Sequence, residues 1–271
     1  MRVSAVSTAT GFCMRMAVFT HSPRHVASEL QDTAPTIESS EGWDIFSHGD
    51  RCLVVRLGSG IDIAVGRRCA AAATALRQAA IAGVSDIVPT FNTVAIHYLP
   101  GHFTTHTSAR KLQEKIERVL YDADLDSGVT GGKLVELPIC YGGEYGPDLA
   151  DVAQRTGLDE AGVIALHGRE PAYVFMLGFA PGAPFMGVHD ERFALPRRST
   201  PRTSIPAGSV AIANRQTVIY PNNLPGGWHV IGRTPVRLFD PDREPSTLIS
   251  PGDTVQFRPI SAEEFKNWSD T

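Results

Sequence analysis

The chain has 271 residues, of which 42% are hydrophobic and 20% charged, and its formal net charge at pH 7 is -4. This composition is that of a globular protein with one large or two modest domains, not of a disordered or fibrous chain. The negative charge gives no general attraction to nucleic acid or anionic membranes, and no run approaches the roughly 20 apolar residues of a membrane-spanning helix. Neither kind of partner is predicted.

The first 41 residues are predicted to be a disordered leader outside the fold. Residues 1–28 contain no acid and carry three arginines among serine, threonine and alanine, a composition typical of organellar transit peptides. Their apolar segments are too short for a secretory signal, and two further methionines offer later start positions. A transit peptide, a misassigned start and a floppy leader are all compatible with this segment.

Residues 42–128 are predicted to form a small α/β domain. Apolar residues recur at helical spacing in an alanine-rich stretch, where Val65, Cys69 and Leu76 mark one face. The expected order is strands 44–48 and 51–57, a helix at 62–82, strands 85–91 and 93–99, and a helix around 112–120. Helices over one face of a mainly antiparallel sheet make an α+β domain.

The acidic, glycine-rich segment 124–132 predicts a domain boundary, and a second domain is expected over residues 133–265. The helices expected there are 148–155 and 159–167, and the strands are 173–179, 209–213, 216–220, 229–231, 236–239 and 254–258. Because proline cannot donate to a central ladder, short strands punctuated by proline and glycine favour a β-barrel or sandwich. Ser261 and Glu264 predict a capping box for a short final helix.

The cysteines point to a reducing compartment. They are Cys13, Cys52, Cys69 and Cys140. They form neither a CxxC pair nor an evenly spaced framework, so we expect reduced thiols that pack as small apolar groups. This usage predicts a cytoplasmic protein.

An acid-free stretch from Phe193 to Phe239 is the most unusual charge pattern in the chain. It contains His229 and six arginines: Arg197, Arg198, Arg202, Arg215, Arg233 and Arg237. Guanidinium groups bind phosphate or carboxylate through a rigid fork of donors, so the cluster suits an anionic ligand. The alternative is that these arginines pair with carboxylates of the first domain or face water.

Three loops combine proline, which fixes backbone shape, with glycine, which lets the backbone approach a ligand closely. They are residues 178–187, 200–209 and 224–229. Ordinary barrel turns are the alternative for any one of them. The turn at 142–148 resembles a phosphate cradle but lacks the lysine and hydroxyl residue of a P-loop, so a tight turn capped by Asp148 is predicted.

No self-contained catalytic apparatus is visible. His102 and His106 are four residues apart, but no glutamate follows His102 and Pro100 indicates a loop, so no metal site is predicted. No G-x-S-x-G elbow occurs, and no cysteine has an obvious histidine partner. The chain is therefore expected to need a second polypeptide.

Four long motifs resemble one known family. They are GFAPGAPFMG at 178–187, TPRTSIPAGSVAIA at 200–213, QTVIYP at 216–221 and PGGWHVIGRTP at 225–235. Their order is similar to that of the 5-oxoprolinase B-subunit family, also called allophanate hydrolase subunit 1, which includes the KipI-type kinase inhibitors. The resemblance spans about residues 43–265 and implies the α+β class, with a small α/β N-terminal domain followed by a cyclophilin-like β-barrel domain. Ala183, Phe185 and Val218 depart from the family pattern, which bears on substrate fit.

The resemblance also implies an activity. Members of this family belong to an ATP-dependent 5-oxoprolinase that converts 5-oxo-L-proline to L-glutamate, so ATP is the implied cofactor. The implied partners are the second cyclophilin-like polypeptide of that enzyme, its C-subunit, and a third, lactam-opening polypeptide, its A-subunit. Phosphate transfer to the lactam carbonyl oxygen would make a good leaving group, and catalysis would then be mainly positioning and charge stabilisation.

The matching positions give a set of candidate site residues. Arg202 and Arg197 are expected to contact phosphate or the substrate carboxylate, and Gln216 completes the catalytic set. The substrate-binding candidates are Thr217, Tyr220, Ser209, Gly226, Gly227, Trp228, Pro181 and Phe185. Among them, the threonine and tyrosine are expected to orient the lactam and the two adjacent glycines to supply backbone donors.

Two other functions fit the same resemblance. The barrel could dock on a sensor histidine kinase and inhibit it, as KipI-type proteins do, without chemistry of its own. The domain pair also resembles part of urea amidolyase, which suggests a carboxyltransferase-type component of urea or allophanate metabolism. The chain has no visible biotin-attachment lysine motif, which counts against that third function.

Overall fold

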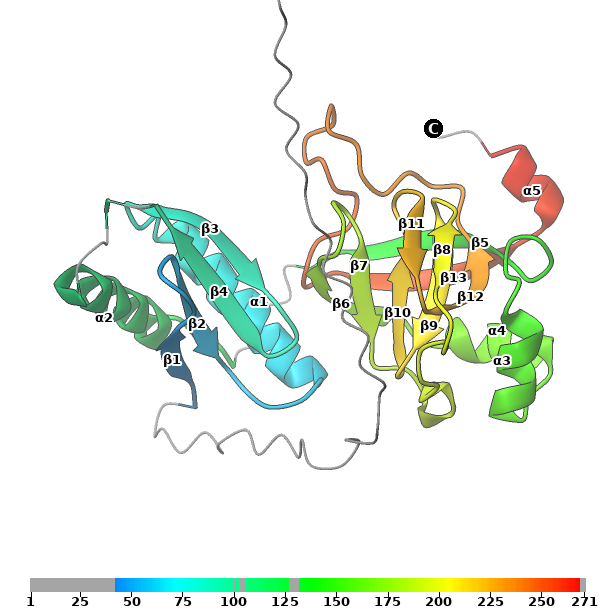
Figure 1. The fold of residues 1–271 in the computed structure, drawn as a ribbon, viewed down its shortest axis with the longest axis horizontal. Helices are drawn as coiled ribbons and strands as arrows, with labels where there is room; N and C mark the ends of the chain where they lie inside the picture. Colours follow the sequence, from blue (N-terminus) through cyan, green and yellow to red (C-terminus); the bar gives the residue numbers. More distant parts are fainter. Residues whose placement is uncertain (1–41, 100, 103–105, 127–131, 269–271) are drawn as a thin grey trace, which may run out of the picture. The chain divides into compact units, whose positions relative to one another are not determined.

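The structure is a computed structural model that describes residues 42–99, 101–102, 106–126 and 132–268 (Figure 1). The predicted leader, 1–41, lies outside the described residues, as does most of the predicted boundary segment. Within the described part of the chain, no helix is long and apolar enough to cross a membrane.

The N-terminal part contains an antiparallel sheet and two helices. Its strands are β1 (Asp44–Ser47), β2 (Cys52–Arg56), β3 (Val84–Pro89) and β4 (Thr93–Tyr98), which lie in the order β1-β2-β4-β3. Helix α1 (Ile63–Gln78) follows β2, and α2 (His106–Asp122) follows β4. The predicted order of two strands and a helix, repeated once, is confirmed.

Both helices bury apolar residues against one face of this sheet. Val55 of β2 and Ile96 of β4 belong to the same buried cluster as Leu76 of α1 and Ile116 of α2. Side chains alternate across a strand, so this cluster occupies a single face. Helix α1 begins after Asp62, whose carboxylate accepts hydrogen bonds from two backbone N–H groups of the first turn and thereby caps it.

The C-terminal part is built around a closed β-barrel. Its strands are β5 (Leu134–Tyr141), β6 (Ala172–Leu177), β7 (Pro184–Gly187), β9 (Ser209–Ala213), β10 (Gln216–Ile219), β12 (His229–Arg233) and β13 (Thr254–Ile260). They pair in the order β10-β7-β6-β13-β5-β12-β9, and the pairing of β9 with β10 closes the ring. Only β5 and β13 are parallel among these described strands.

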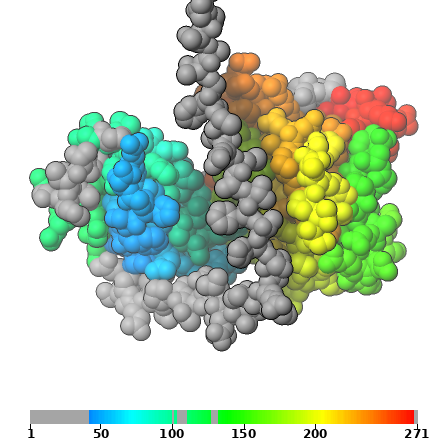
Figure 2. Space-filling model, viewed as in Figure 1, coloured from blue at the N-terminus to red at the C-terminus, as the bar shows by residue number. Residues whose placement is uncertain are grey.

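Shorter elements decorate the barrel. They are α3 (Leu149–Thr156), α4 (Glu160–His167), the 3₁₀ turn η1 (Glu191–Phe193), the hairpin of β8 (Arg202–Ile205) with β11 (Leu224–Gly226), and α5 (Ala262–Lys266). Helix α3 contacts β12, and in Figure 2 the green surface, which contains α3 and α4, lies beside the yellow surface of the barrel. The α+β class with a β-barrel is confirmed, as is the capping box of Ser261 and Glu264 on α5.

Three sequence predictions about this part are wrong. Residues 236–239 form no strand but only an isolated bridge between Phe239 and Thr247. Asp148 does precede α3, yet its side chain makes no capping hydrogen bond. Its carboxylate instead accepts hydrogen bonds from arginine side chains. Strands β7, β8 and β11, each of three or four residues, were expected to be loops because β7 and β11 contain proline and glycine and β8 lies between two prolines.

Candidate active site

Asp148 anchors two arginines of the acid-free stretch. Arg202 donates from both terminal nitrogens to its carboxylate, at 2.6 and 2.8 Å, and Arg198 donates at 2.7 Å. The backbone N–H of Val230 donates to the same carboxylate at 2.8 Å. The Asp148 side chain is 5% exposed, whereas both guanidinium groups are about 30% exposed. One buried carboxylate therefore fixes the 198–202 segment and strand β12.

The charges at this cluster do not cancel. Burial raises the pKa of Asp148, but hydrogen bonds from Arg202 and Val230 and the charges of Arg202 and Arg198 outweigh it, so that the pKa lies below the usual value. Two guanidinium ions share one carboxylate, which leaves one positive charge in excess. These arginines pair within the second domain, not with the first domain as the alternative prediction supposed.

An aromatic cluster lies beside these arginines and gathers several candidate residues. Phe185 and Trp228 are in edge-on contact at 6.0 Å between ring centroids. Arg197 is exposed and places its guanidinium 5.4 Å from the Trp228 ring centroid, a cation–π arrangement. Burial raises the pKa of Tyr220, although the charge of Arg197 and a hydrogen bond from the Trp228 backbone oppose that effect. Tyr220, Trp228, Phe185 and Arg197 thus form one aromatic cluster, in which Arg197 is exposed, Phe185 is partly exposed, and the other two side chains are buried.

Two of the predicted site residues, Gly226 and Gly227, lie next to the aromatic cluster. A Cβ atom at Gly226 would collide with the Tyr220 hydroxyl group, so only glycine allows that contact. Gly226 also pairs with Arg202 in the β8–β11 hairpin. The carbonyl oxygen of Gly227 accepts a hydrogen bond from the backbone N–H of Arg198 at 2.6 Å. The hairpin therefore connects the aromatic cluster to the Asp148 anchor.

His229 fixes the segment that carries Arg197. The Nε2 atom of His229 lies 2.9 Å from the carbonyl oxygen of Pro196 and donates to it. Its side chain is 1% exposed, so it acts on a ligand only through the neighbouring residues. Pro181, another candidate, is exposed on the 178–187 loop.

Three candidates are buried. Thr217 is fully buried, and its hydroxyl group lies 2.9 Å from Nε2 of His167 and 2.7 Å from Nε2 of His189. Ser209 and Gln216 are also buried, at 1% and 9% exposure. Their strands β9 and β10 place them in the barrel wall. With no exposed surface, Thr217 can influence a ligand only through its neighbours, which differs from the predicted direct contact.

The buried Thr217 hydroxyl belongs to a chain of polar side chains. The Tyr141 hydroxyl lies 2.8 Å from Nδ1 of His167. From His167 the series of hydrogen bonds runs through the Thr217 hydroxyl to His189. Burial lowers the pKa of His167 well below its usual value, and burial with the nearby charge of Arg215 lowers the pKa of His189 to about 4. Both imidazoles are therefore neutral near pH 7, and each hydroxyl hydrogen serves one ring nitrogen.

The remaining arginines of the acid-free stretch serve the backbone or the surface. Arg215 donates to the carbonyl oxygen of His189 and Arg233 to that of Ala207. Arg237 is exposed and donates to the carbonyl oxygen of Phe239. The six arginines therefore do not form one anion site, and only Arg197, Arg198 and Arg202 lie together.

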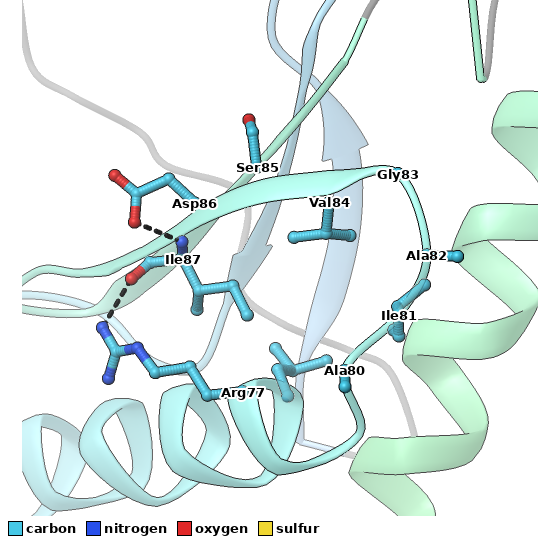
Figure 3. A pocket seen from close by; sticks show the side chains of 10 residues that line it. Arg77, Ala80, Ile81, Ala82, Gly83, Val84, Ser85, Asp86 and Ile87 are labelled. Atoms are coloured by element: carbon cyan, nitrogen blue, oxygen red, sulfur yellow. Dashed lines mark hydrogen bonds between the residues drawn. The ribbon is translucent and has the colours of Figure 1, made fainter.

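A separate open pocket of about 480 Å³ lies in the N-terminal part, between the end of α1 and β3 (Figure 3). Arg77 donates to the carbonyl oxygen of Ile87 at 2.6 Å, and the N–H of Ile87 donates to the Asp86 carboxylate. Strand β3 is an edge strand, and unpaired edge groups invite pairing with other chains. These side chains therefore protect the sheet edge, and the pocket contains none of the candidate residues.

Sequence reasoning missed Asp148 as the partner of the arginines, and it missed Phe179 and His189. The sequence pattern indicates only that Asp148 caps a tight turn, although a carboxylate next to the barrel can neutralise arginines of the acid-free stretch. Phe179 was read only as part of a loop motif. Among the described residues, no group of three His, Cys, Asp or Glu side chains has metal-binding geometry.

Comparison with known proteins places the chain in a family. A family model described as carboxyltransferase domain, subdomain C and D, matches residues 43–249. The 5-oxoprolinase B-subunit of Bacillus subtilis is 38% identical over 227 residues, which cover 80% of this chain and 92% of that protein. The chain belongs to the 5-oxoprolinase B-subunit family. The resemblance seen in the motifs is therefore confirmed.

Solved structures agree with this family fold. The protein TTHA0988 superposes with a TM-score of 0.68 at 35% identity, over 78% of this chain and 40% of that one. This member of the 5-oxoprolinase B-subunit family thus matches less than half the length of that protein. The urea amidolyase of Kluyveromyces lactis has a TM-score of 0.66 at 18% identity and covers 85% of this chain and 16% of its own. That likeness concerns the fold alone.

Proposed function

We propose that the chain is one component of an ATP-dependent 5-oxoprolinase, which hydrolyses 5-oxo-L-proline to L-glutamate. One observation carries the proposal: the Bacillus subtilis 5-oxoprolinase B-subunit aligns over 92% of its length, across both parts of the fold. We further propose that the chain is inactive alone and works with the C-subunit of that enzyme and with its lactam-opening A-subunit. Its buried free cysteines suit a cytoplasmic location.

The reaction requires activation of a poor electrophile. A five-membered amide resists attack by water, and ATP would supply the phosphoryl group that activates the lactam carbonyl oxygen. The residues of this chain would then hold the substrate and stabilise negative charge while the ring opens. The exposed guanidinium group of Arg197 beside the aromatic cluster suits that task, since a partner polypeptide can cover it.

Arg197 is the strongest candidate for contact with phosphate or with the substrate carboxylate. It is exposed, it faces Trp228, and no ion pair joins it to a carboxylate of the described residues. Its fork of donors is therefore available for an anion. Arg202 has two of its nitrogens committed to Asp148, so we assign it a supporting role: with Arg198 it supplies the excess positive charge and holds the hairpin.

The test is reconstitution with the partner polypeptides and measurement of glutamate released from 5-oxoproline, with and without ATP. Arg197→Ala should lower turnover at least tenfold without a change in melting temperature. Arg237→Ala is the matched control, because this arginine is also exposed in the acid-free stretch but serves only the local surface. No ATP-dependent glutamate from the wild-type complex, or full activity in Arg197→Ala, would refute the proposal in whole or in part.

The Arg202→Ala variant needs a second measurement. It should lower turnover, but it also removes the bidentate partner of a buried carboxylate, which destabilises the fold. Melting temperature must therefore be recorded beside activity. A kinase inhibitor of the KipI type would instead show no turnover with any partner and would copurify with a histidine kinase.

A further inference from the structure

The 178–187 loop contains a strained turn at Phe179. The φ angle of Phe179 is +68°, and the backbone N–H of Ala180 donates to the carbonyl oxygen of Gly178 at 2.7 Å. A hydrogen bond two residues back with a positive central φ defines a γ-turn of the rare, strained form. Positive φ is unfavourable for a bulky side chain, so glycine would be the easier residue here.

The surrounding loop prevents the turn from relaxing. The N–H of Gly178 donates to the carbonyl oxygen of Ala183, and the N–H of Ala183 donates to that of Ala180. Gly182 has a φ of +78° and lies so close to Phe239 that an added Cβ would clash with it. The loop is thus bonded at both ends and packed at its base, and these contacts hold Phe179 in its unfavourable conformation.

The strain does not bury the Phe179 ring. The side chain is 66% exposed, and its ring meets the Tyr220 ring edge-on with 6.4 Å between centroids. The Tyr220 hydroxyl group accepts a hydrogen bond from the Trp228 backbone, and both this bond and the charge of Arg197 lower its pKa. Folding therefore holds an apolar ring at the rim of the aromatic cluster without the gain that burial would bring. Strained residues of this kind concentrate where ligands bind.

We propose that Phe179 is a specificity-determining contact for the ring of the lactam substrate. The inference rests on the proposed function. The substrate class that fits is a small flat ring with methylene groups and one carboxylate. The substrate ring lies against the exposed Phe179 ring, which the buried Tyr220 supports edge-on, and the carboxylate lies toward the exposed Arg197. The methylene groups do not react, so their contact is equal in the ground state and the transition state. Its loss raises KM and leaves kcat unchanged.

Substitution by glycine separates this role from packing. Phe179→Gly removes the ring and also the backbone strain, since glycine accepts a positive φ. In the reconstituted complex we expect KM for 5-oxoproline to rise about tenfold with kcat within about twofold, while the melting temperature stays equal or rises by about 3 °C. Phe179→Tyr should retain the wild-type KM, and Phe179→Leu should lie between the two. Phe46→Ala, at an exposed phenylalanine of β1, should change nothing.

Each other outcome overturns the assignment. A lower melting temperature in Phe179→Gly would show that the ring stabilises the fold. Failure of Phe179→Gly to assemble with its partner polypeptides, measured by size-exclusion chromatography, would make Phe179 a docking residue instead. An unchanged KM with an active wild type would reject the substrate contact alone, whereas a wild-type complex that releases no glutamate would reject the proposed function and this contact with it.

Discussion

The barrel contains two buried polar centres that are stabilised in opposite ways, one with charged groups and the other with neutral groups. At Asp148 a buried carboxylate keeps its charge because two guanidinium groups and a backbone N–H surround it. In the hydrogen-bonded series Tyr141, His167, Thr217 and His189, the buried groups are neutral, and both imidazoles are hydrogen-bonded to the Thr217 hydroxyl group. The Asp148 centre is stabilised by Coulomb attraction between opposite charges. The neutral centre is stabilised because every hydroxyl and imidazole hydrogen has a hydrogen-bond acceptor.

This difference separates the proposed site from the interior of the barrel. The charged centre reaches the exterior through partly exposed arginines and is joined to the aromatic cluster by the β8–β11 hairpin. The neutral centre is enclosed, with His167 and Thr217 at 0% exposure. Charge is therefore kept where an anion can approach and is avoided where the barrel wall must stay closed.

The largest effect is expected from Asp148→Ala. Two partly buried guanidinium groups would lose their counter-ion, so the free energy of unfolding should fall by about 4 kcal/mol. The folded pKa of Asp148 is lowered, so its contribution is present above the ordinary aspartate pKa and is lost as pH falls through the folded value. Urea unfolding at pH 7 measures the loss. Asp190→Ala, which removes a partly exposed partner of Arg192, should cost far less, and equal losses would contradict the account.

Thr217→Val should break the neutral centre. Valine keeps the shape of the side chain but leaves Nε2 of both His167 and His189 without a partner, and each unpaired buried group costs about 1–3 kcal/mol. The expected loss is about 3 kcal/mol, again by urea unfolding. Thr203→Val, at an exposed position of β8, is the control. A loss no larger than that of the control would mean that the hydroxyl group is dispensable.

Acid should weaken the neutral centre by a smaller amount. The folded pKa of His189 is about 4, and an unfolded histidine titrates near 6.5. Between these values the unfolded chain binds more protons, so stability falls as pH decreases from about 6.5 to 4, by about 2 kcal/mol between pH 8 and 5. Unfolding curves at several pH values would show this slope. His189→Gln should reduce the slope to the part that His167 contributes, because burial lowers the pKa of that histidine as well. An equally steep slope in the variant would locate the titration elsewhere.

The smallest effect is expected at the edge of the N-terminal sheet, where the Arg77 guanidinium donates one hydrogen bond to a backbone carbonyl group. Arg77→Ala removes the donor to Ile87 and should cost about 1 kcal/mol. Analytical ultracentrifugation should also detect increased self-association, because the edge of β3 becomes available for pairing. Arg67→Ala, an exposed arginine of the same helix, provides the comparison, and similar behaviour of the two variants would remove the edge-protecting role.

Local patterns predicted the elements whose residues carry their own signal. Strand β9 has the predicted bounds, and β10 and β13 begin at the predicted residues, because each is a short apolar run between turn signals. Helix α1 followed from its spacing of apolar residues. By contrast, β11 contains proline and glycine and β8 is flanked by prolines, and the two strands form a hairpin only because Arg202 and Gly226 come together across more than 20 residues. Such pairing has no local signature.

The site was predictable in composition but not in geometry. The acid-free stretch led to Arg197, Trp228 and the glycines, which the structure gathers. It could not show that Asp148, some 50 residues before Arg198 in the chain, would neutralise part of the cluster. Nor could alternation along β10 show which side of the wall would receive Thr217, because both faces of that strand are buried.

The parallel pairing of β5 with β13 has a consequence for biosynthesis. Residues 133 and 253 are bonded to each other through the N–H of Lys133 and the carboxylate of Asp253, 120 positions apart. Strand β13 also lies between β5 and β6. The ring of strands therefore stays open on the ribosome until β13 has left the exit tunnel, and during that interval β5 and β6 lack the neighbour they share. Nascent chains stalled before residue 254 should be captured by chaperones, whereas chains released after residue 260 should not.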